Sequence, residues 1–403
     1  MKKFLLILTK ILTGILLVAA TVFIASNITP IYNFEEPEPF NGPDIFDPYE
    51  DMDWDLGWKR ANFHTHTRVK GIFNECPHWP DTVYRDYARL GYDILTFSNH
   101  NEITEHPTDS ALQVDVYEHG YNIFQFHKLV FGPKNGVNLF DHLTPFMPSQ
   151  RQWQLDMLSH NADFLILNHP DRTRLTTKRD MEVLTGYRIM EGDSGVSTEF
   201  IHWDEALSAG HYSFGITNDD CHNSRASGRI AVRCSFLNSP SAGYEDIKNT
   251  LLSGKFYSMR VPDYGNGDWD AKYAGNADLP YVRHIGASGD TISLRLSRPA
   301  ASIVAIGQGH TALSKVEDAD SLGYVMTPSD SYVRMTAYFD DGAVIYTNAF
   351  ARYDKSEAES PYRESPHPVN IPFTILFNLL VVLLTAGCIL MFIRLFPHKE
   401  KES

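Results

Sequence analysis

Hydrophobic residues follow two different patterns along this chain. Residues 4–25 and 371–396 are apolar runs whose only charged residues are Lys10 and Arg394, and each is long enough to cross a bilayer as a helix. Between them, short apolar runs alternate with segments in which apolar residues recur every three or four positions. The first pattern predicts two terminal membrane helices, and the second predicts strands that alternate with helices.

The alternation predicts the architecture of the region that follows residue 57. The predicted strands cover residues 61–66, 92–97, 114–118, 128–131, 164–167, 187–190, 214–217, 230–236 and 256–257. The predicted helices cover residues 81–90, 149–159, 198–209 and 244–252. Such alternation over about 200 residues is typical of a parallel α/β barrel or a doubly wound sheet, and we favour the barrel.

The pattern changes after residue 260. Residues 263–280 are rich in Gly and Asp and read as a loop, and residues 291–297 then alternate strictly between apolar and polar side chains. Residues 332–339 alternate again and lead through Asp341-Gly342 into residues 343–346, which predicts a hairpin. We expect a small β-sandwich-like domain here.

These patterns divide the chain into six parts. They are an N-terminal anchor (1–26), an acidic linker (27–57), the α/β barrel (58–262), the β-sandwich-like domain (281–353), a polar linker (354–370) and a C-terminal transmembrane helix (371–396). A cleaved signal peptide is the alternative for residues 1–26. Lys2 and Lys3 before the first run and the basic residues after the second place both ends in the cytoplasm, so the barrel is expected on the extracytoplasmic side of the cell membrane.

Composition narrows the classes of partner. The 403 residues are 43% apolar and 12% aromatic, as in a folded protein, and the formal net charge is −15. A surface this acidic repels nucleic-acid backbones, so no nucleic-acid polymer is expected as a partner. Cys388 lies in the second apolar run, and the other three cysteines cannot form a disulfide framework, although one bridge is possible. The oligomeric state is left open.

Histidines and carboxylates mark the ends of the predicted strands. In a parallel barrel the carboxyl ends of the strands meet at one rim, where active sites are built. The candidate metal ligands at these positions are His64, His66, His100, Glu118, His127, His169, Asp220 and His222. One such histidine is more often a structural side chain, but eight residues of this kind in one domain predict a metal centre.

This ligand set suits a centre with more than one divalent ion. A carboxylate can bridge two ions while imidazoles complete each shell, and Zn, Mn or Fe all accept such ligands. Water bound to the metal becomes a hydroxide nucleophile, and the ions accept the charge that develops on a phosphoryl oxygen. Glu118 and Asp220 are the candidate catalytic carboxylates.

Four motifs carry a family resemblance. His64-Thr65-His66, Ser98-Asn99-His100, Asn168-His169-Pro170 and Asp220-Cys221-His222 resemble, in this order, the motifs of the PHP (polymerase and histidinol phosphatase) family of metal-dependent phosphoesterases. The resemblance spans residues 58–262 and implies a distorted (β/α)7 barrel, with the β-rich part as an appended domain.

The resemblance also implies how the ligands are shared. His64, His66, Glu118 and Asp220 would hold a first ion, Glu118 would bridge to a second ion held by His127 and His169, and His100 and His222 would hold a third. Asn99 stands where the family usually has an aspartate, which weakens ligand positioning. A further ligand to the third ion is missing, and Asn74, Glu75 and His78 are candidates to replace it. The number of ions per chain, two or three, is therefore left open.

Other charged residues lie close to the ligand motifs in sequence. Arg68, Lys70, Arg172 and Arg225 can reach a substrate phosphate as cations, although each can equally be an ordinary solvated charge. His119 and Asp219 adjoin ligands and are candidates to support them, whereas Cys221 is expected to pack in the interior.

The function expected from the sequence is hydrolysis of a phosphate ester by a membrane-anchored, extracytoplasmic metalloenzyme. Two alternatives remain. An amidohydrolase-like enzyme would cleave a C–N bond or a lactone on a similar centre, often with a carboxylated lysine, and no lysine is seen to end a core strand. A non-catalytic binding or sensor module would be expected to lose ligands, and all eight are present. The substrate itself is not identified.

Overall fold

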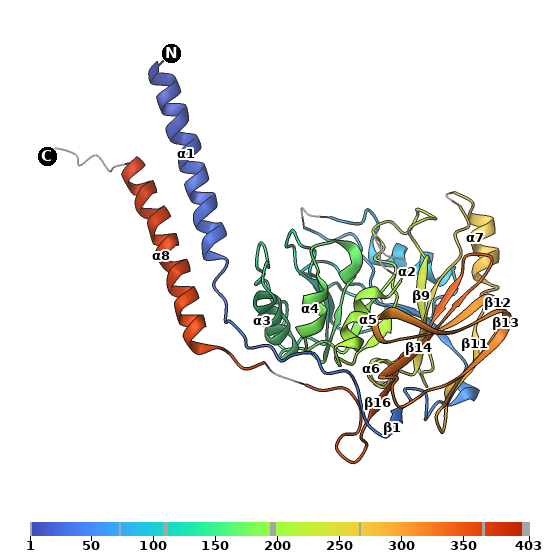
Figure 1. The fold of residues 1–403 in the computed structure, drawn as a ribbon. Helices are drawn as coiled ribbons and strands as arrows, with labels where there is room; N and C mark the ends of the chain where they lie inside the picture. The colour runs from blue at the N-terminus through green and yellow to red at the C-terminus, as the bar shows by residue number, and fades with distance from the viewer. Residues whose placement is uncertain are drawn as a thin grey trace.

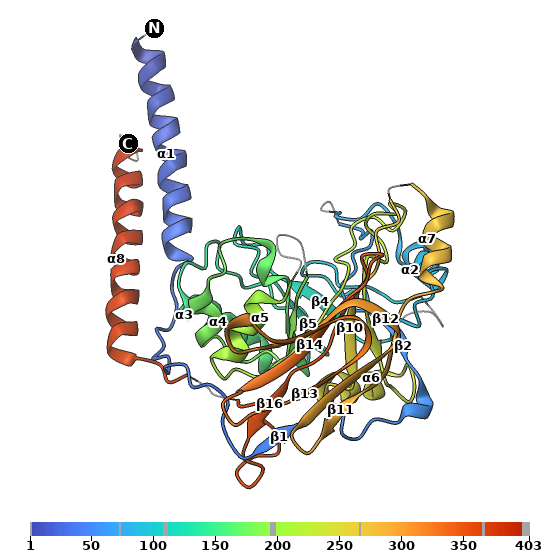
Figure 2. The same cartoon turned by 45° about the vertical axis from the view of Figure 1, so that its right-hand side comes forward.

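The chain folds into a globular α/β part with two apolar terminal helices (Figure 1). The structure is a computed structural model, and it describes residues 2–71, 74–107, 112–193, 199–265, 267–364 and 367–396. The terminal helices are α1 (Lys2–Ala25) and α8 (Ile371–Leu395), both long and apolar enough to cross a membrane. They run side by side in opposite directions, because N and C lie at the same end of the pair in both views (Figure 2).

Five strands form the first sheet, in the order β4-β5-β6-β7-β8. They are β4 (Val116–His119), β5 (Lys128–Phe131), β6 (Phe164–Leu167), β7 (Ile189–Glu191) and β8 (Phe214–Ile216). The pairs β6–β7 and β7–β8 are parallel, as expected, but β4–β5 and β5–β6 are antiparallel. The connection of residues 120–127 explains the difference, because a parallel crossover needs about a dozen residues or more.

The second sheet joins the remaining strands of the α/β region to the β-rich part. Its main path is β1-β16-β14-β15-β10-β9-β2-β3, and β12 pairs with β11, β13 and β14. The strands are β1 (Asp44–Phe46), β2 (Lys59–Asn62), β3 (Ile94–Leu95), β9 (Arg233–Leu237), β10 (Phe256–Arg260), β11 (Val282–Ser288), β12 (Thr291–Gly307), β13 (Thr311–Val325), β14 (Tyr332–Tyr338), β15 (Val344–Tyr346) and β16 (Phe350–Tyr353). Strand pairing among the described residues does not close these two sheets into one ring, so the (β/α)7 barrel is not confirmed.

Helices cover both sheets and supply two hydrophobic cores. The helices are α2 (Pro80–Ala88), α3 (Pro148–Ser159), α4 (Lys178–Val183), α5 (Ile201–Ser208), α6 (Tyr244–Ser253) and α7 (Trp269–Asn276), with 3-10 turns η1 (Trp54–Leu56), η2 (Pro170–Arg172) and η3 (Gln308–His310). Leu155 of α3 and Trp203 of α5 pack in the core of the first sheet, and Val83 of α2 packs in the core of the second. Figure 1 shows α3, α4 and α5 on the side that faces the terminal helices.

Several local predictions need correction. Residues 263–280 contain α7, whose first turn is capped by Asp268 through a 3.0 Å hydrogen bond from the Ala271 amide. The alternating stretch 291–297 is the first part of a longer strand, β12, which runs to Gly307 and pairs with β13. All four cysteines are buried and free, so the bridge that the sequence left open is not formed.

Candidate metal centre

The candidate ligands converge where the two sheets meet. His64 and His66 follow β2, and a bridge between Thr65 and Cys221 ties their segment to the end of β8. His100 follows β3, and its backbone pairs with that of Glu118 at the end of β4. The structure therefore brings together residues whose strands belong to different sheets, as the strand-end rule predicts.

His127 reaches the centre for a different reason. It precedes β5 rather than ending it, so a parallel sheet would carry it to the far edge. Because β5 is antiparallel to β4 and β6, Lys128 pairs with His119 and Leu167, the last residues of those strands. The start of β5 thus lies at the same edge as the ends of its neighbours, and His127 sits beside Glu118 and His169.

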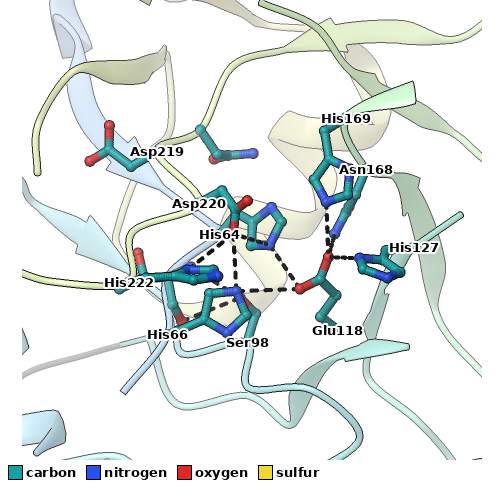
Figure 3. Close-up of polar contacts among 12 residues, drawn as sticks. His64, His66, Ser98, Glu118, His127, Asn168, His169, Asp219, Asp220 and His222 are labelled. Atoms are coloured by element: carbon teal, nitrogen blue, oxygen red, sulfur yellow. Dashed lines mark hydrogen bonds and ion pairs between the residues drawn. The ribbon is translucent and has the colours of Figure 1, made fainter. Parts of the chain in front are cut away.

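Glu118 lies at the middle of the cluster (Figure 3). Its Oε1 atom is 3.1 Å from His127 Nδ1 and 3.2 Å from His169 Nε2, and it accepts a 2.9 Å hydrogen bond from Asn168. Its Oε2 atom is 3.1 Å from both His64 Nε2 and His100 Nε2 and 3.3 Å from His66 Nε2. The two oxygens of one carboxylate therefore face different histidines, which is the arrangement of a bridging ligand.

Asp220 faces a second set of rings. Its Oδ1 atom is 3.2 Å from His64 Nε2, 3.1 Å from His66 Nε2 and 3.5 Å from His222 Nδ1. Both Asp220 and His169 have positive φ, 48° and 24°, a conformation that costs about 1–3 kcal/mol at a non-glycine residue. Strain at two candidate ligands is consistent with a backbone that is shaped to aim their side chains.

Four overlapping groups of ligand atoms are close enough to hold an ion. They are His64, His66, Glu118 and Asp220; His64, His169 and Glu191; His66, Glu75 and His222; and His100, Glu118 and His127. The first group has the same members as the first ion site implied by the family resemblance. The others divide the remaining ligands differently, and they add Glu75 and Glu191.

Three ring nitrogens indicate whether the cluster around Glu118 suits a cation. His64 Nε2, His66 Nδ1 and His222 Nδ1 are buried and have no hydrogen-bond partner among the described residues. Yet they lie 3.1 Å from Glu118, 3.4 Å from Glu75 and 3.5 Å from Asp220, respectively. Buried polar atoms are normally hydrogen-bonded, so nitrogen lone pairs and carboxylates that face one another without a bond are a good fit to divalent cations between them.

Charge and burial set the protonation states of the ligands. Burial raises the pKa of Glu118, but the imidazoles of His100, His64 and His127 outweigh it and hold this pKa well below its usual value. Burial lowers the pKa of His127 and of His222 to about 4. At His64 and His66 the neighbouring carboxylates of Glu118 and Asp220 outweigh burial, so the pKa of His64 is raised well above its usual value and that of His66 to about 9. Metal binds ionised carboxylates and neutral imidazoles, so a bound ion would take the place of the protons on His64 and His66.

Glu191 is a candidate ligand that the sequence analysis missed. It is the last residue of β7, and its carboxylate lies 3.2 Å from His64 Nδ1. It also accepts hydrogen bonds from the His169 backbone N–H (3.1 Å) and from Asn218 Nδ2 (3.0 Å). The predicted strand 187–190 ends one residue before it, so the strand-end rule was sufficient to find it.

The residues next to the ligands support the surrounding loops. Asp219 points away from the cluster and accepts hydrogen bonds from the backbone of residues 231–233 and from the Tyr87 hydroxyl (Figure 3). Asn99 contacts the Thr67 amide and hydroxyl, at 2.8 and 2.7 Å, and His119 contacts the Phe140 carbonyl at 2.8 Å. Cys221 is buried, as expected.

The four candidate phosphate-binding cations have different positions. Arg172 reaches the centre, where its guanidinium contacts Asp220. Arg68 and Lys70 line a separate pocket of about 570 Å³. Arg225 is 65% exposed and lies 3.9 Å from Asp86. Of these cations, Arg172 is therefore the one whose side chain touches a candidate ligand.

Comparisons with known proteins find likenesses only among solved structures, since no family model and no curated protein matches the chain. The chain is similar to a two-domain protein from Bacteroides vulgatus ATCC 8482 that contains a predicted PHP-like metal-dependent phosphoesterase. The identity is 12%, the match covers 78% of this chain and 100% of that chain, and the TM-score is 0.36.

A second likeness is to the lesion-specific endonuclease PfuEndoQ from Pyrococcus furiosus. The identity is 10%, the match covers 48% of this chain and 56% of that chain, and the TM-score is 0.33. The name of the first protein includes the PHP family, which is also the family that the sequence motifs resemble. At these identities and TM-scores neither likeness carries a conclusion about activity, which has to come from the site.

Proposed function

We propose that this chain is a membrane-anchored, extracytoplasmic metal-dependent phosphoesterase of the PHP type, with the metal chemistry in residues 58–262. The observation that carries the proposal is the position of Glu118, whose two oxygens face different histidines at 3.1–3.3 Å. A structural role for these histidines would pair their ring nitrogens with hydrogen-bond partners, and several have none among the described residues.

Bound divalent ions would supply an activated water nucleophile and positive charge opposite the developing phosphoryl charge. The residues of the chain have three tasks. Glu118 would hold two ions, because each of its oxygens has imidazole neighbours. Asp220 positions His64 and His66, and Arg172, which is within contact of Asp220, is placed to bind a phosphate oxygen.

Lys128 bears on the amidohydrolase-like alternative. This buried lysine starts β5 beside His127, a position that the sequence analysis passed over. Its Nζ atom donates to the Phe126 carbonyl and to Gln154 Oε1, both at 2.9 Å. Neighbouring residues of a strand point to opposite faces, so Lys128 is directed away from the side that His127 occupies. It is therefore poorly placed to become a carboxylated bridging ligand.

The terminal helices support anchoring at both ends. Asn378 of α8 and the backbone of Thr29, which follows α1, exchange hydrogen bonds of 3.1 and 3.0 Å, and Thr374 accepts one of 2.8 Å from Ile31. The helices are thus held together at the end nearest the globular part. Lys2, Lys3 and Arg394 lie at the other end, where the positive-inside rule places cytoplasm.

The experiment that tests this function combines metal content with activity. The purified full chain in detergent is analysed by plasma mass spectrometry and assayed against a generic aryl phosphate monoester and diester. We expect two or three ions per chain and hydrolysis that a chelator removes. His66→Ala and Asp220→Ala should lose at least about 100-fold in activity and bind less metal, because each removes a candidate ligand.

His160→Ala is the matched control, because His160 is an exposed histidine at the end of α3 that touches no candidate ligand. It should keep the activity and the metal content of the parent chain. Full activity in either ligand variant would contradict the mechanism. Bound metal without turnover of any phosphate ester would favour the amidohydrolase-like alternative, and absence of metal would favour a binding or sensor module.

A further inference from the structure

Six large apolar side chains are exposed on two adjacent loops of the globular part. The loops, residues 121–124 and 139–146, are called here the apolar loops. The exposed residues are Tyr121, Ile123, Leu139, Phe140, Leu143 and Phe146. Ile123 is 70% and Leu139 is 72% exposed. Such a concentration on a globular surface marks a contact with another apolar surface rather than scattered surface residues.

A partly buried polar frame fixes the conformation of the apolar loops. The carboxylate of Asp141 accepts hydrogen bonds from the amides of Tyr121 (2.9 Å) and Asn122 (3.0 Å) and from Gln154 of α3 (2.5 Å). The Ile123 amide donates to the Leu143 carbonyl, which joins the two loops directly. The apolar side chains are therefore presented outward by a supported backbone and have not simply been left outside a poorly packed core.

The apolar loops contact the end of α1. The Phe146 ring packs edge-to-face against Phe23, with centroids 6.2 Å apart, and His142 Nδ1 lies 2.7 Å from the Ser26 carbonyl. Gln150 of α3 donates a 2.9 Å hydrogen bond to Asn27. In both views α3 is the helix of the globular part nearest to α1 and α8 (Figures 1 and 2). Phe23 lies two residues before the end of α1. If α1 crosses a bilayer, Phe23 and the Phe146 ring that packs against it lie at the outer boundary of that bilayer.

The same loops border the candidate metal centre. Tyr121 and Leu139 line a pocket of about 400 Å³ together with His100 and Glu75, and the Tyr121 ring lies 4.9 Å from the His100 ring. Val69 and Glu102 line both this pocket and the neighbouring one that contains Arg68 and Lys70. An apolar surface thus continues from the end of α1 to the mouth of the centre, and the basic side chains of Arg68 and Lys70 lie in the neighbouring pocket.

We propose that the apolar loops enter the outer leaflet of the membrane and that the substrate is a phosphate ester in the headgroup of a membrane lipid. The inference rests on the proposed function, including anchoring through α1. The acyl chains would stay in the bilayer beside Ile123 and Leu143 while the phosphate reaches the centre past Tyr121. In the reaction a water oxygen bonds to phosphorus, the phosphorus–oxygen bond to the lipid alcohol breaks, and the alcohol oxygen leaves with the electron pair and gains a proton.

The first test measures the position of the loops without measuring activity. A spin label is attached to Ile123→Cys in the full chain reconstituted into phosphatidylcholine vesicles, and Val325→Cys on β13 is the control, since Val325 is 61% exposed. The four native cysteines are buried, so the introduced thiol is the reactive one. We expect oxygen, which concentrates in hydrocarbon, to relax the label at position 123 more than a water-soluble nickel chelate does, and the reverse at position 325.

Equal behaviour at positions 123 and 325 would overturn the inference. A label at position 123 that is immobilised and shielded from both relaxing agents would also overturn it, because a partner protein or a second copy would then cover the loops. Neither outcome depends on whether the metal centre is loaded.

The second test compares substrates with the metal-loaded full chain. The probes are phosphatidate and phosphatidylglycerol in phosphatidylcholine vesicles, and a soluble aryl phosphate monoester and diester. Ile123→Ser with Leu143→Ser should lower kcat/KM on the vesicle substrate about tenfold or more and leave the soluble substrate unchanged. Ile201→Ser with Val325→Ser, which removes exposed aliphatic side chains elsewhere, should change neither.

The outcomes separate the two proposals. Hydrolysis of the soluble ester without hydrolysis of either lipid, or equal losses on both kinds of substrate, would show that the lipid inference is wrong while the proposed function stands. Absence of hydrolysis of every ester by the loaded chain would show that the proposed function is wrong, and the lipid substrate would be rejected with it.

Discussion

At the scale of single residues, Glu191 offers a sharp test of the centre. Its carboxylate faces His64 Nδ1 and accepts hydrogen bonds from the His169 amide and from Asn218. In Glu191→Gln one carboxylate oxygen becomes an NH2 group, which has to face a hydrogen-bond donor. We expect metal affinity, measured by competition with a fluorescent chelator, to fall about 10- to 100-fold, as is typical when a group that orients a ligand is lost.

Glu205→Gln is the control for this variant. Glu205 also accepts from a histidine, His202 Nδ1 at 2.6 Å, but it belongs to none of the four candidate ion groups. Its replacement should leave metal affinity unchanged. Equal affinity in both variants would mean that Glu191 neither binds an ion nor orients His64.

Seven of the eight predicted ligands were accessible from sequence because strand ends have fixed positions in an α/β sheet, whereas His127 precedes β5 and reaches the centre because β5 is antiparallel to its neighbours. Glu191 follows the same rule and was overlooked, since Tyr187–Met190 reads as a complete strand without it. Glu75 is a different case, because the sequence named it only as one of three candidates for a missing ligand to the third ion. It lies 3.4 Å from His66 and from His100 through a loop whose path is set by contacts such as that of Asn74 with the Val69 amide, and no periodic pattern encodes such a path.

At the scale of secondary-structure elements, one buried ion pair connects α5 to the β-rich part. Asp204 of α5 accepts hydrogen bonds from Arg334 of β14 at 2.8 and 2.6 Å, and both side chains are 1% exposed. Arg334→Met would leave the Asp204 carboxylate buried without its main partner. We expect the free energy of unfolding, measured by urea titration, to fall by about 3–5 kcal/mol.

The Arg298–Asp341 pair provides the control, because both side chains are 41% exposed. Arg298→Met should cost no more than about 1 kcal/mol, as is usual for surface ion pairs. Similar losses in the two variants would show that α5 and β14 are not coupled through Asp204.

The same cluster predicts a pH dependence. A hydrogen bond from His310 to Asp204, opposed by partial burial, raises the pKa of His310 above its usual value. A raised pKa in the folded state contributes stability that is complete below the unfolded value of about 6.5 and is lost as pH rises through the folded value. The difference in urea midpoint between the parent chain and His310→Gln should therefore shrink from pH 6 to pH 9, and a constant difference would contradict it.

The elements that sequence predicted least well are those whose side chains face solvent. β13 has mainly exposed positions, so it lacks the apolar alternation that marks a half-buried strand, and it is formed because β12 supplies a long partner. The antiparallel direction of β5 could not be predicted either, because the hydrophobic pattern indicates which residues are buried but not which way a strand runs. The helices α3 and α6 were placed within a residue, although α3 buries mainly polar side chains and α6 has apolar residues on its buried face.

At the scale of the whole molecule, the candidate ions would join two sheets. His64, His66 and His100 follow strands of the larger sheet, whereas Glu118 and His127 belong to the smaller one. Buried carboxylates and imidazoles face one another across this junction, and several ring nitrogens have no hydrogen-bond partner among the described residues. Metal that binds only the folded state stabilises it by about 2.7 kcal/mol at a concentration 100 times Kd.

Removing the metal should therefore lower the melting temperature of the full chain in detergent. For a protein of 403 residues the expected change is about 3 °C, followed by tryptophan fluorescence, and readdition of Mn²⁺ or Zn²⁺ should restore it. Asp220→Ala should respond less to chelator, because its affinity for metal is already reduced, whereas His160→Ala should respond like the parent chain. Identical melting of the parent chain with and without chelator would mean that the sheets are held together by protein contacts alone, and the cluster around Glu118 would then need a role other than metal binding.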